Sequence, residues 1–343
     1  MSLKLRLFEV DVCRAIVTVL LLILHSFAIY SGAWPRPEDI DYINLYYWIG
    51  KLPNGFMLQT YVLISGYLWG RSAYNVIHPK IGDTIKSKAI RLLIPGILFS
   101  TLYYIFFVYN GTFSLSDLFI IFSGSGHLWF LPMLFWCFVF SALSHRFIKD
   151  ARVILFLSLI LYIISVNVRS LGLGGATYYY LFFEVGAYIY MQRNKLDKIN
   201  GSLILFVLVI FLVLFVPITK ITDKVAINIT TSNTIETKLL WLWLKNIVSL
   251  PLAIVGGVLC MSISFYIARY YYNYCNSAYF ISKHSFSIYL WHQFILISLY
   301  QWYEFRTLCG EYFLPWCGLV VSSIVSIFLS VSTKQFALGR KYL

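Results

Sequence analysis

The residues of this sequence best suited to chemistry are an arginine and a histidine in its first apolar stretch, Arg14 and His25. Every residue between them is apolar except Thr18. Ionisable side chains are costly inside a bilayer, so they mark functional sites by default. Eleven residues at about 100° each make roughly three turns, which puts both side chains on one helix face, about 16 Å apart along the axis. The alternative is an arginine that snorkels to the membrane interface and a histidine that hydrogen-bonds a neighbouring helix.

The composition places these two residues in a membrane. The chain has 343 residues, of which 60% are hydrophobic and 12% charged, and its mean hydropathy is +0.76. A soluble domain has about twice that charged fraction, and apolar segments of about 17 to 25 residues recur along the chain. We therefore expect an all-α, polytopic membrane protein that forms a single domain over residues 1–343, with no separate soluble domain. The stretch Leu7–Tyr30 lacks a small-residue cleavage site, so we expect a retained first helix rather than a signal peptide.

The apolar segments predict about ten transmembrane helices. They cover residues 10–30, 55–71, 88–108, 127–145, 153–168, 176–192, 201–219, 240–265, 284–302 and 314–333. With a cytoplasmic N-terminus, 19 of the 27 basic residues fall inside and seven outside, which fits the positive-inside rule and makes both termini cytoplasmic. The net charge of +13 is then mostly topology, and no nucleic-acid partner is expected. Two longer outer loops are expected at residues 31–54 and 220–239.

The densest basic segment is the inner loop from Arg71 to Arg91. Lys88 and Arg91 are three residues apart where the third span begins, so they share a helix face. Arg14 also lies at the inner boundary, and together these cations would form a pocket for a phosphate-bearing ligand. The alternative is that they only orient the chain in the membrane.

Two further polar residues stand next to predicted spans. Asp11 precedes Arg14 by three residues, so it can pair with the guanidinium and fix its direction. His127 opens the fourth span from the outer side. There it either helps hold an acceptor hydroxyl or caps a helix end.

Other ionisable residues fall within or near the spans. Glu184 lies well inside a span, so we expect it either to orient a catalytic histidine or to balance Lys245. His292 lies in mid-helix, with a helix-contact role and a site role equally open. The six cysteines form no metal-type pair, and we expect no metal site. Cys309 and Cys317 both lie near the outer face, where a disulfide is chemically allowed.

Several segments, in order along the chain, together resemble the bacterial acyltransferase-3 family of integral-membrane O-acyltransferases. They are Asp11-x-x-Arg14, the Arg14 and His25 pair with ten residues between, Ser65-Gly66-Tyr67-Leu68, Lys88-x-x-Arg91-Leu-Leu-Ile-Pro95, His127-Leu-Trp129-Phe130-Leu and Ser285-Phe-Ser-Ile-Tyr289-Leu-Trp-His292. Each motif is weak alone, but their order over residues 8 to about 300 is specific. One departure is Lys88, where the family often has an arginine; lysine keeps the charge and loses bidentate phosphate contacts.

The resemblance implies transfer of an acetyl group from cytoplasmic acetyl-CoA, through a bacterial inner membrane, to a sugar hydroxyl of a surface polysaccharide such as an O-antigen or exopolysaccharide. It also implies that His25 is catalytic and that Arg14 helps to hold the coenzyme. Beside these two, we take as catalytic candidates Asp11, Glu184 and His127, and as coenzyme-binding candidates Lys88, Arg91 and Arg71.

The residues themselves fit that chemistry. Acetyl-CoA has phosphates at one end and a thioester at the end of a long arm, which suits a basic pocket with a histidine about three turns deeper. Neutral imidazole can take a proton from the acceptor hydroxyl, or it can take the acetyl group first and pass it on. Both routes stay open, as do the sugar, the oligomeric state and an acyl group other than acetyl.

Two other classes of membrane protein share the span count. A lipid-linked oligosaccharide flippase would line a central cavity with charge along several spans, whereas the mid-membrane ionisable residues here are few: His25, Glu184, Lys245 and His292. A polysaccharide polymerase needs a large outer loop with arginines, and residues 220–239 contain none. The distribution of charge therefore favours the transferase.

Overall fold

A computed structural model describes residues 7–73, 81–166, 171–271 and 275–333, and within these ranges the chain is helical and has no strand. This confirms the predicted all-α class. The helices are α1 Phe8–Ser26, α2 Ala28–Ser31, α3 Asn44–Asn54, α4 Met57–Ala73, α5 Ile81–Lys88, α6 Ile94–Phe107, α7 Leu115–Ser123, α8 Phe130–Phe147, α9 Ala151–Ile164, α10 Leu173–Met191, α11 Gly201–Thr231, α12 Ile235–Tyr270, α13 Cys275–Gln301 and α14 Tyr303–Thr333. A π-helical turn, Ala89–Leu93, joins α5 to α6, and 3-10 turns cover Gly126–Trp129 and Arg193–Lys198.

Helix length and composition make the chain a multi-pass membrane protein. Among the described residues, five helical segments are long and apolar enough to cross a membrane: Ile81–Phe107, Gly126–Phe147, Gly201–Thr231, Ile235–Tyr270 and Tyr303–Thr333. A helix overlaps each of the ten predicted spans, including α1, whose composition alone is less apolar because it carries Glu9, Asp11 and Arg14. The total of ten spans, the cytoplasmic termini and the single domain stay predictions.

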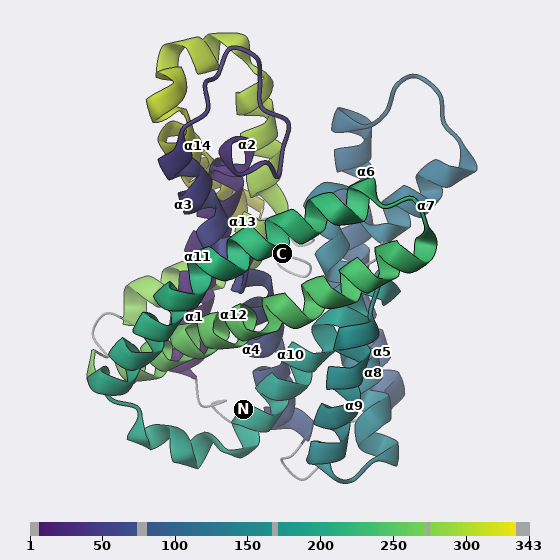
Figure 1. Ribbon diagram of the computed structural model, residues 1–343, viewed down its shortest axis with the longest axis vertical. Helices are drawn as coiled ribbons and strands as arrows, with labels where there is room; N and C mark the ends of the chain where they lie inside the picture. The colour runs from purple at the N-terminus through teal and green to yellow at the C-terminus, as the bar shows by residue number, and fades with distance from the viewer. Residues whose placement is uncertain (1–6, 74–80, 167–170, 272–274, 334–343) are drawn as a thin grey trace.

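The first helix lies among helices from distant parts of the chain. α1 packs against α3, α4, α12, α13 and α14. In Figure 1, α2, α3, α13 and α14 gather at the upper left, α8 and α9 lie at the lower right, and α11 and α12 run side by side across the view. Arg14 and His25 are therefore surrounded by segments that the sequence separates by up to about 300 residues.

Helices α4 and α10 approach each other closely enough to require glycine. A Cβ on Gly66 would lie 1.9 Å from the carbonyl oxygen of Phe183, and a Cβ on Gly186 would lie 2.0 Å from that of Leu63. Small residues allow such backbone contact between membrane helices. The Ser65-Gly66 motif therefore positions α4, which in turn packs against α1.

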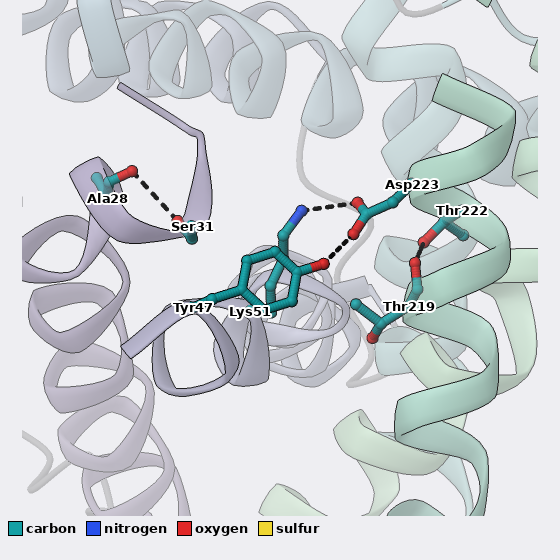
Figure 2. Close-up of polar contacts among 7 residues, drawn as sticks. All are labelled: Ala28, Ser31, Tyr47, Lys51, Thr219, Thr222 and Asp223. Atoms are coloured by element: carbon teal, nitrogen blue, oxygen red, sulfur yellow. Dashed lines mark hydrogen bonds and ion pairs between the residues drawn. The ribbon is translucent and has the colours of Figure 1, made fainter. Parts of the chain in front are cut away.

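The sequence predicted an outer loop at residues 220–239, but most of this segment is helical. α11 continues to Thr231 and α12 begins at Ile235, so three residues connect them. The Thr, Ser and Asn content suggested a loop, but threonine hydroxyls bond to carbonyls of their own helix, as Thr222 does to Thr219 at 2.9 Å (Figure 2). The sequence pattern missed this because hydroxyls can be satisfied inside a helix.

The other predicted outer loop, residues 31–54, contains helix α3, which is tied to α11. Lys51 Nζ lies 2.7 Å from Asp223 Oδ1, and the Tyr47 hydroxyl donates to the other oxygen of the same carboxylate (Figure 2). Trp48 of α3 also packs edge-on against Phe215 of α11. Helix α3 also packs against α1, and its Gly50 lies against Phe27, the residue that follows the last turn of α1.

Candidate active site on the first helix

Arg14 and His25 occupy one unbroken helix, α1. The helix carries Glu9 and Asp11 in its first turn, where the positive end of the helix dipole favours carboxylates. It ends at Ser26, because Phe27 leaves the helical conformation. We refer to the first turns of α1 as the Arg14 end and to its last turn as the His25 end.

His25 is half-buried and contacts three groups. Its Nδ1 lies 3.1 Å from the carbonyl oxygen of Leu21 and 3.2 Å from Nε2 of His292 on α13. Its ring centroid is 4.7 Å from that of His292 and 5.7 Å from that of Trp34, which follows α2. The ring is therefore held on the Nδ1 side and covered by an indole.

His127 joins the same group of rings. Its ring centroid lies 4.9 Å from that of His292, and its Nε2 lies 2.8 Å from the carbonyl oxygen of Tyr289. The Tyr289 hydroxyl donates to the His127 carbonyl oxygen at 2.7 Å. The structure thus brings together His25, His127 and His292, which we call the histidine cluster; each of its members had been considered from the sequence.

A polar contact lies between Arg14 and His25. The Thr18 hydroxyl donates to the Arg14 carbonyl oxygen at 2.7 Å and lies 2.8 Å from the hydroxyl of Tyr61 on α4. Thr18 is fully buried. Thr18 and Tyr61 were not among the predicted site residues, although Thr18 is one turn from Arg14 and is the one polar residue between Arg14 and His25.

Lys88 and Arg91 lie on and beside the π-helical turn rather than on a regular α-helix. Proline lacks an N–H and clashes with the carbonyl four residues earlier, and Pro95 stands four residues after Arg91. The widened turn that results is a feature often found at functional sites. The Lys88 ammonium lies 3.8 Å above the ring of Phe138.

Three cations lie close together at the Arg14 end. Arg14, Lys88 and Arg91 are near enough to repel one another. In the part of the chain that the structure describes, none of the three has a carboxylate within ion-pair distance. Arg91 also lines a hollow of about 310 Å³ together with Asp83, Lys86, Ser87 and Ile90.

The sequence predicted that Asp11 pairs with Arg14, but the structure gives Asp11 a different hydrogen-bond partner. The Asp11 carboxylate is buried and accepts a hydrogen bond from the Ser282 hydroxyl of α13 at 2.8 Å. Residues three apart on an α-helix differ by about 60° around its axis, so Asp11 faces α13 while Arg14 faces the other cations. Asp11 attracts the guanidinium from this position but forms no ion pair with it in the described residues.

Glu184 has a partner that neither sequence interpretation named. Its Oε2 lies 3.0 Å from His145 Nε2, not beside His25 or Lys245. Helix α10 packs against α4, α8 and α9, and His145 belongs to α8. The charged groups nearest to Lys245 are Lys51 and Asp223. A catalytic role for Glu184 stays a prediction.

Arg71 lies at the Arg14 end. The hydroxyl of Tyr67, one turn earlier on α4, donates to the Glu9 carboxylate at 3.1 Å, which sets the last turn of α4 beside the first turn of α1. Cys309 and Cys317 are free thiols in the structure. Within the described ranges, no group of three His, Cys, Asp or Glu side chains is arranged to hold a metal ion.

Comparison with known protein families shows which family the chain belongs to. A sequence model of the acyltransferase-3 family, described as an acyltransferase domain, matches residues 7–334. No curated protein and no solved structure gives a significant match. Because the family match covers nearly the whole chain, this protein belongs to the acyltransferase-3 family, as the motifs predicted.

Proposed function

We propose that this membrane acyltransferase moves an acetyl group from cytoplasmic acetyl-CoA to a hydroxyl of a cell-surface polysaccharide, an O-antigen or exopolysaccharide, at a bacterial inner membrane. One observation carries the proposal: a single helix joins a group of cations without an ion-paired carboxylate at one end to a half-buried histidine at the other. Both chain termini are then cytoplasmic, and the Arg14 end faces the coenzyme.

The cations at the Arg14 end support an anionic donor. Like charges held close together cost free energy, and the phosphates of a coenzyme would remove that cost. Arg14 and Arg91 can bind phosphate with two parallel N–H donors each, whereas Lys88 acts as a point charge. The hollow beside Arg91 gives phosphate groups a place next to Lys86 and Arg91. Arg71, at the same end, adds charge.

The ring of Trp34 supports a sugar acceptor at the His25 end. Its centroid is 5.7 Å from that of His25 and 6.2 Å from that of Tyr300. The segment that carries it is held by an ion pair between Arg306 and Asp39 at 2.8 Å. An indole combines an apolar face with a polar N–H, and such a surface suits the face of a sugar ring.

The reaction needs a group that takes a proton near neutral pH, and His25 supplies an imidazole. In the direct route, the acceptor oxygen attacks the thioester carbonyl, the C–S bond breaks, and the hydroxyl proton moves to His25 and then to the leaving thiolate. In the stepwise route, a ring nitrogen of His25 attacks the thioester carbonyl, and the C–S bond breaks to release the thiolate. The acceptor oxygen then attacks the acetyl group, the N–C bond breaks, and the hydroxyl proton passes through the freed ring nitrogen to the thiolate. The same side chain serves both routes.

Mass spectrometry of surface glycans tests the proposal. Cells that lack the protein should lose the mass of one acetyl group per acceptor residue, and the wild-type gene should restore it. His25→Ala should restore nothing while the protein is made and inserted at the wild-type level. Normal acetylation with His25→Ala would refute the role of His25. If deletion instead shortens the glycan without changing its acetylation, or removes the glycan altogether, the protein is a flippase or polymerase.

A further inference from the structure

The hydrogen bonds of His25 show which of its nitrogens carries the proton. Nδ1 lies 3.1 Å from the Leu21 carbonyl oxygen. A carbonyl oxygen only accepts hydrogen bonds, so Nδ1 must be the protonated nitrogen. In the neutral ring, the lone pair then belongs to Nε2.

The hydrogen bonds of His292 lead to a matching result. Its Nδ1 lies 3.0 Å from the carbonyl oxygen of Ile288 and 2.8 Å from that of Tyr289, so Nδ1 carries the hydrogen. Its Nε2 therefore presents a lone pair, and that atom lies 3.2 Å from Nδ1 of His25. The Nδ1–H of His25 is thus shared between Leu21 and His292, and every group has a compatible partner.

We propose that His292 is a positioning residue, which accepts a hydrogen bond from Nδ1–H of His25 and leaves Nε2 of His25 as the reacting atom. For its chemistry this inference rests on the proposed function. When Nε2 takes the hydroxyl proton or the acetyl group, the ring becomes positively charged, and its Nδ1–H bonds more strongly to His292. In the direct route, the proton on Nε2 then passes to the leaving thiolate. In the stepwise route, the acceptor oxygen attacks the acetyl group, the Nε2–C bond breaks, and the hydroxyl proton passes through the freed Nε2 to the thiolate. His292 gains and loses no proton in either route.

His292 here takes the place that a carboxylate holds in the catalytic triads of hydrolases, where the partner fixes the tautomer of the histidine and stabilises its charged form. A neutral hydrogen-bond acceptor suits the position of His292. In the resting enzyme His25 is neutral, so a carboxylate buried in that position would be an unpaired charge. The arrangement provides orientation without that cost.

Other residues keep His292 in place. His292 is fully buried, and the ring of His127 packs edge-on against it. His127 is fastened to α13 on both sides of His292: the Tyr289 hydroxyl donates to its carbonyl oxygen at 2.7 Å, and the side-chain oxygen of Gln293 accepts from its backbone N–H at 2.9 Å. This assigns His127 to support of His292 rather than to contact with the acceptor.

Nitrogen-15 NMR of histidine-labelled protein in lipid tests the inference without any substrate. In the wild type, His25 should show a protonated Nδ1 and an unprotonated Nε2, with its signals assigned by their loss in His25→Ala. In His292→Phe, Nδ1–H keeps only the Leu21 carbonyl as an acceptor, so the fraction of His25 protonated on Nε2 should rise above its wild-type value. A wild-type His25 protonated on Nε2, or a His25 tautomer unchanged in His292→Phe, would overturn the inference even if the transferase proposal holds.

Kinetics give the second measurement. His292→Phe should lower kcat by about 10- to 100-fold, as removal of the outer partner of a functional histidine does elsewhere, with the KM for acetyl-CoA unchanged. His292→Gln should keep most of kcat, because its amide oxygen can accept from Nδ1–H of His25. His284→Phe is the matched control: it removes another buried histidine of α13, bonded to Ser330 at 2.7 Å, and should leave the His25 tautomer unchanged. Equal losses with Phe and Gln at position 292 would refute acceptance of this hydrogen bond.

Discussion

Basic side chains form ion pairs at one end of α1 and not at the other. At the Arg14 end, Arg14, Lys88 and Arg91 lie close together with no carboxylate in ion-pair distance among the described residues. At the His25 end, Lys51 is paired with Asp223 and Arg306 with Asp39. Both regions belong to a protein in which charged residues are scarce, 12% of the chain.

The difference separates charges that tie elements of the protein together from charges that the proposed function assigns to ligand binding. A carboxylate beside a cation neutralises it and ties two elements, as Asp223 ties α3 to α11. Cations grouped without an ion-paired carboxylate repel one another, and a bound anion would relieve that repulsion. The Arg14 end therefore fits a phosphate-bearing donor, and the His25 end fits an uncharged acceptor held by shape and aromatic contact.

The strongest test of this comparison removes one cation at each end. Arg14→Ala should raise the KM for acetyl-CoA about 10- to 100-fold, because a hydrogen bond to a charged group contributes about 1.5 to 3 kcal/mol. Lys51→Ala, which removes a paired cation, should leave that KM unchanged. Steady-state kinetics on protein in lipid provide both values. An equal rise in the KM for acetyl-CoA with Arg14→Ala and Lys51→Ala would show that the two ends of α1 do not differ in donor binding.

A weaker effect is expected at the acceptor side. Trp34→Ala should raise the KM for the acceptor by up to about tenfold, since aromatic contacts contribute about 0.5 to 1.5 kcal/mol beyond their burial. The KM for acetyl-CoA should not change, and Trp34→Phe should restore most of the loss by keeping an aromatic face. A change in donor KM alone would place Trp34 on the wrong side of the reaction.

The smallest effect concerns the ion pair that holds the Trp34 segment. The hydrogen bond from Arg306 lowers the pKa of Asp39 below its ordinary value. A carboxyl whose pKa is lowered on folding stabilises the fold above its unfolded pKa, about 3.9, and loses that contribution as pH falls through the folded value. Asp39→Asn should therefore lower the free energy of unfolding at pH 7 by about 0.5 kcal/mol or less.

Thermal unfolding in detergent measures this contribution as a difference between the two proteins. The difference between wild type and Asp39→Asn should vanish in acid, below the folded pKa of Asp39, and shrink in high salt. A difference that persisted in acid would show that Asp39 acts through its shape and not its charge.

Local patterns in the sequence predicted much of this protein. The membrane class, the positions of the helices and the family followed from apolar length and from motifs such as Lys88-x-x-Arg91. What these patterns did not give was which helix lies beside which. Glu184 has His145 as its partner, and Asp11 has Ser282. The pairing of α3 with α11 through Asp223 had no local signal either.

The sequence by itself determined that Arg14 and His25 share a helix, because the repeat of an α-helix depends only on spacing along the chain. Only the tertiary structure decided what surrounds them. His292 lies 267 residues after His25, and the two rings meet because α13 packs against α1. The three cations of the Arg14 end likewise come from α1, from the last residue of α5 and from the π turn before Pro95. Helix packing depends on the fit of whole surfaces, which spacing along one segment does not record.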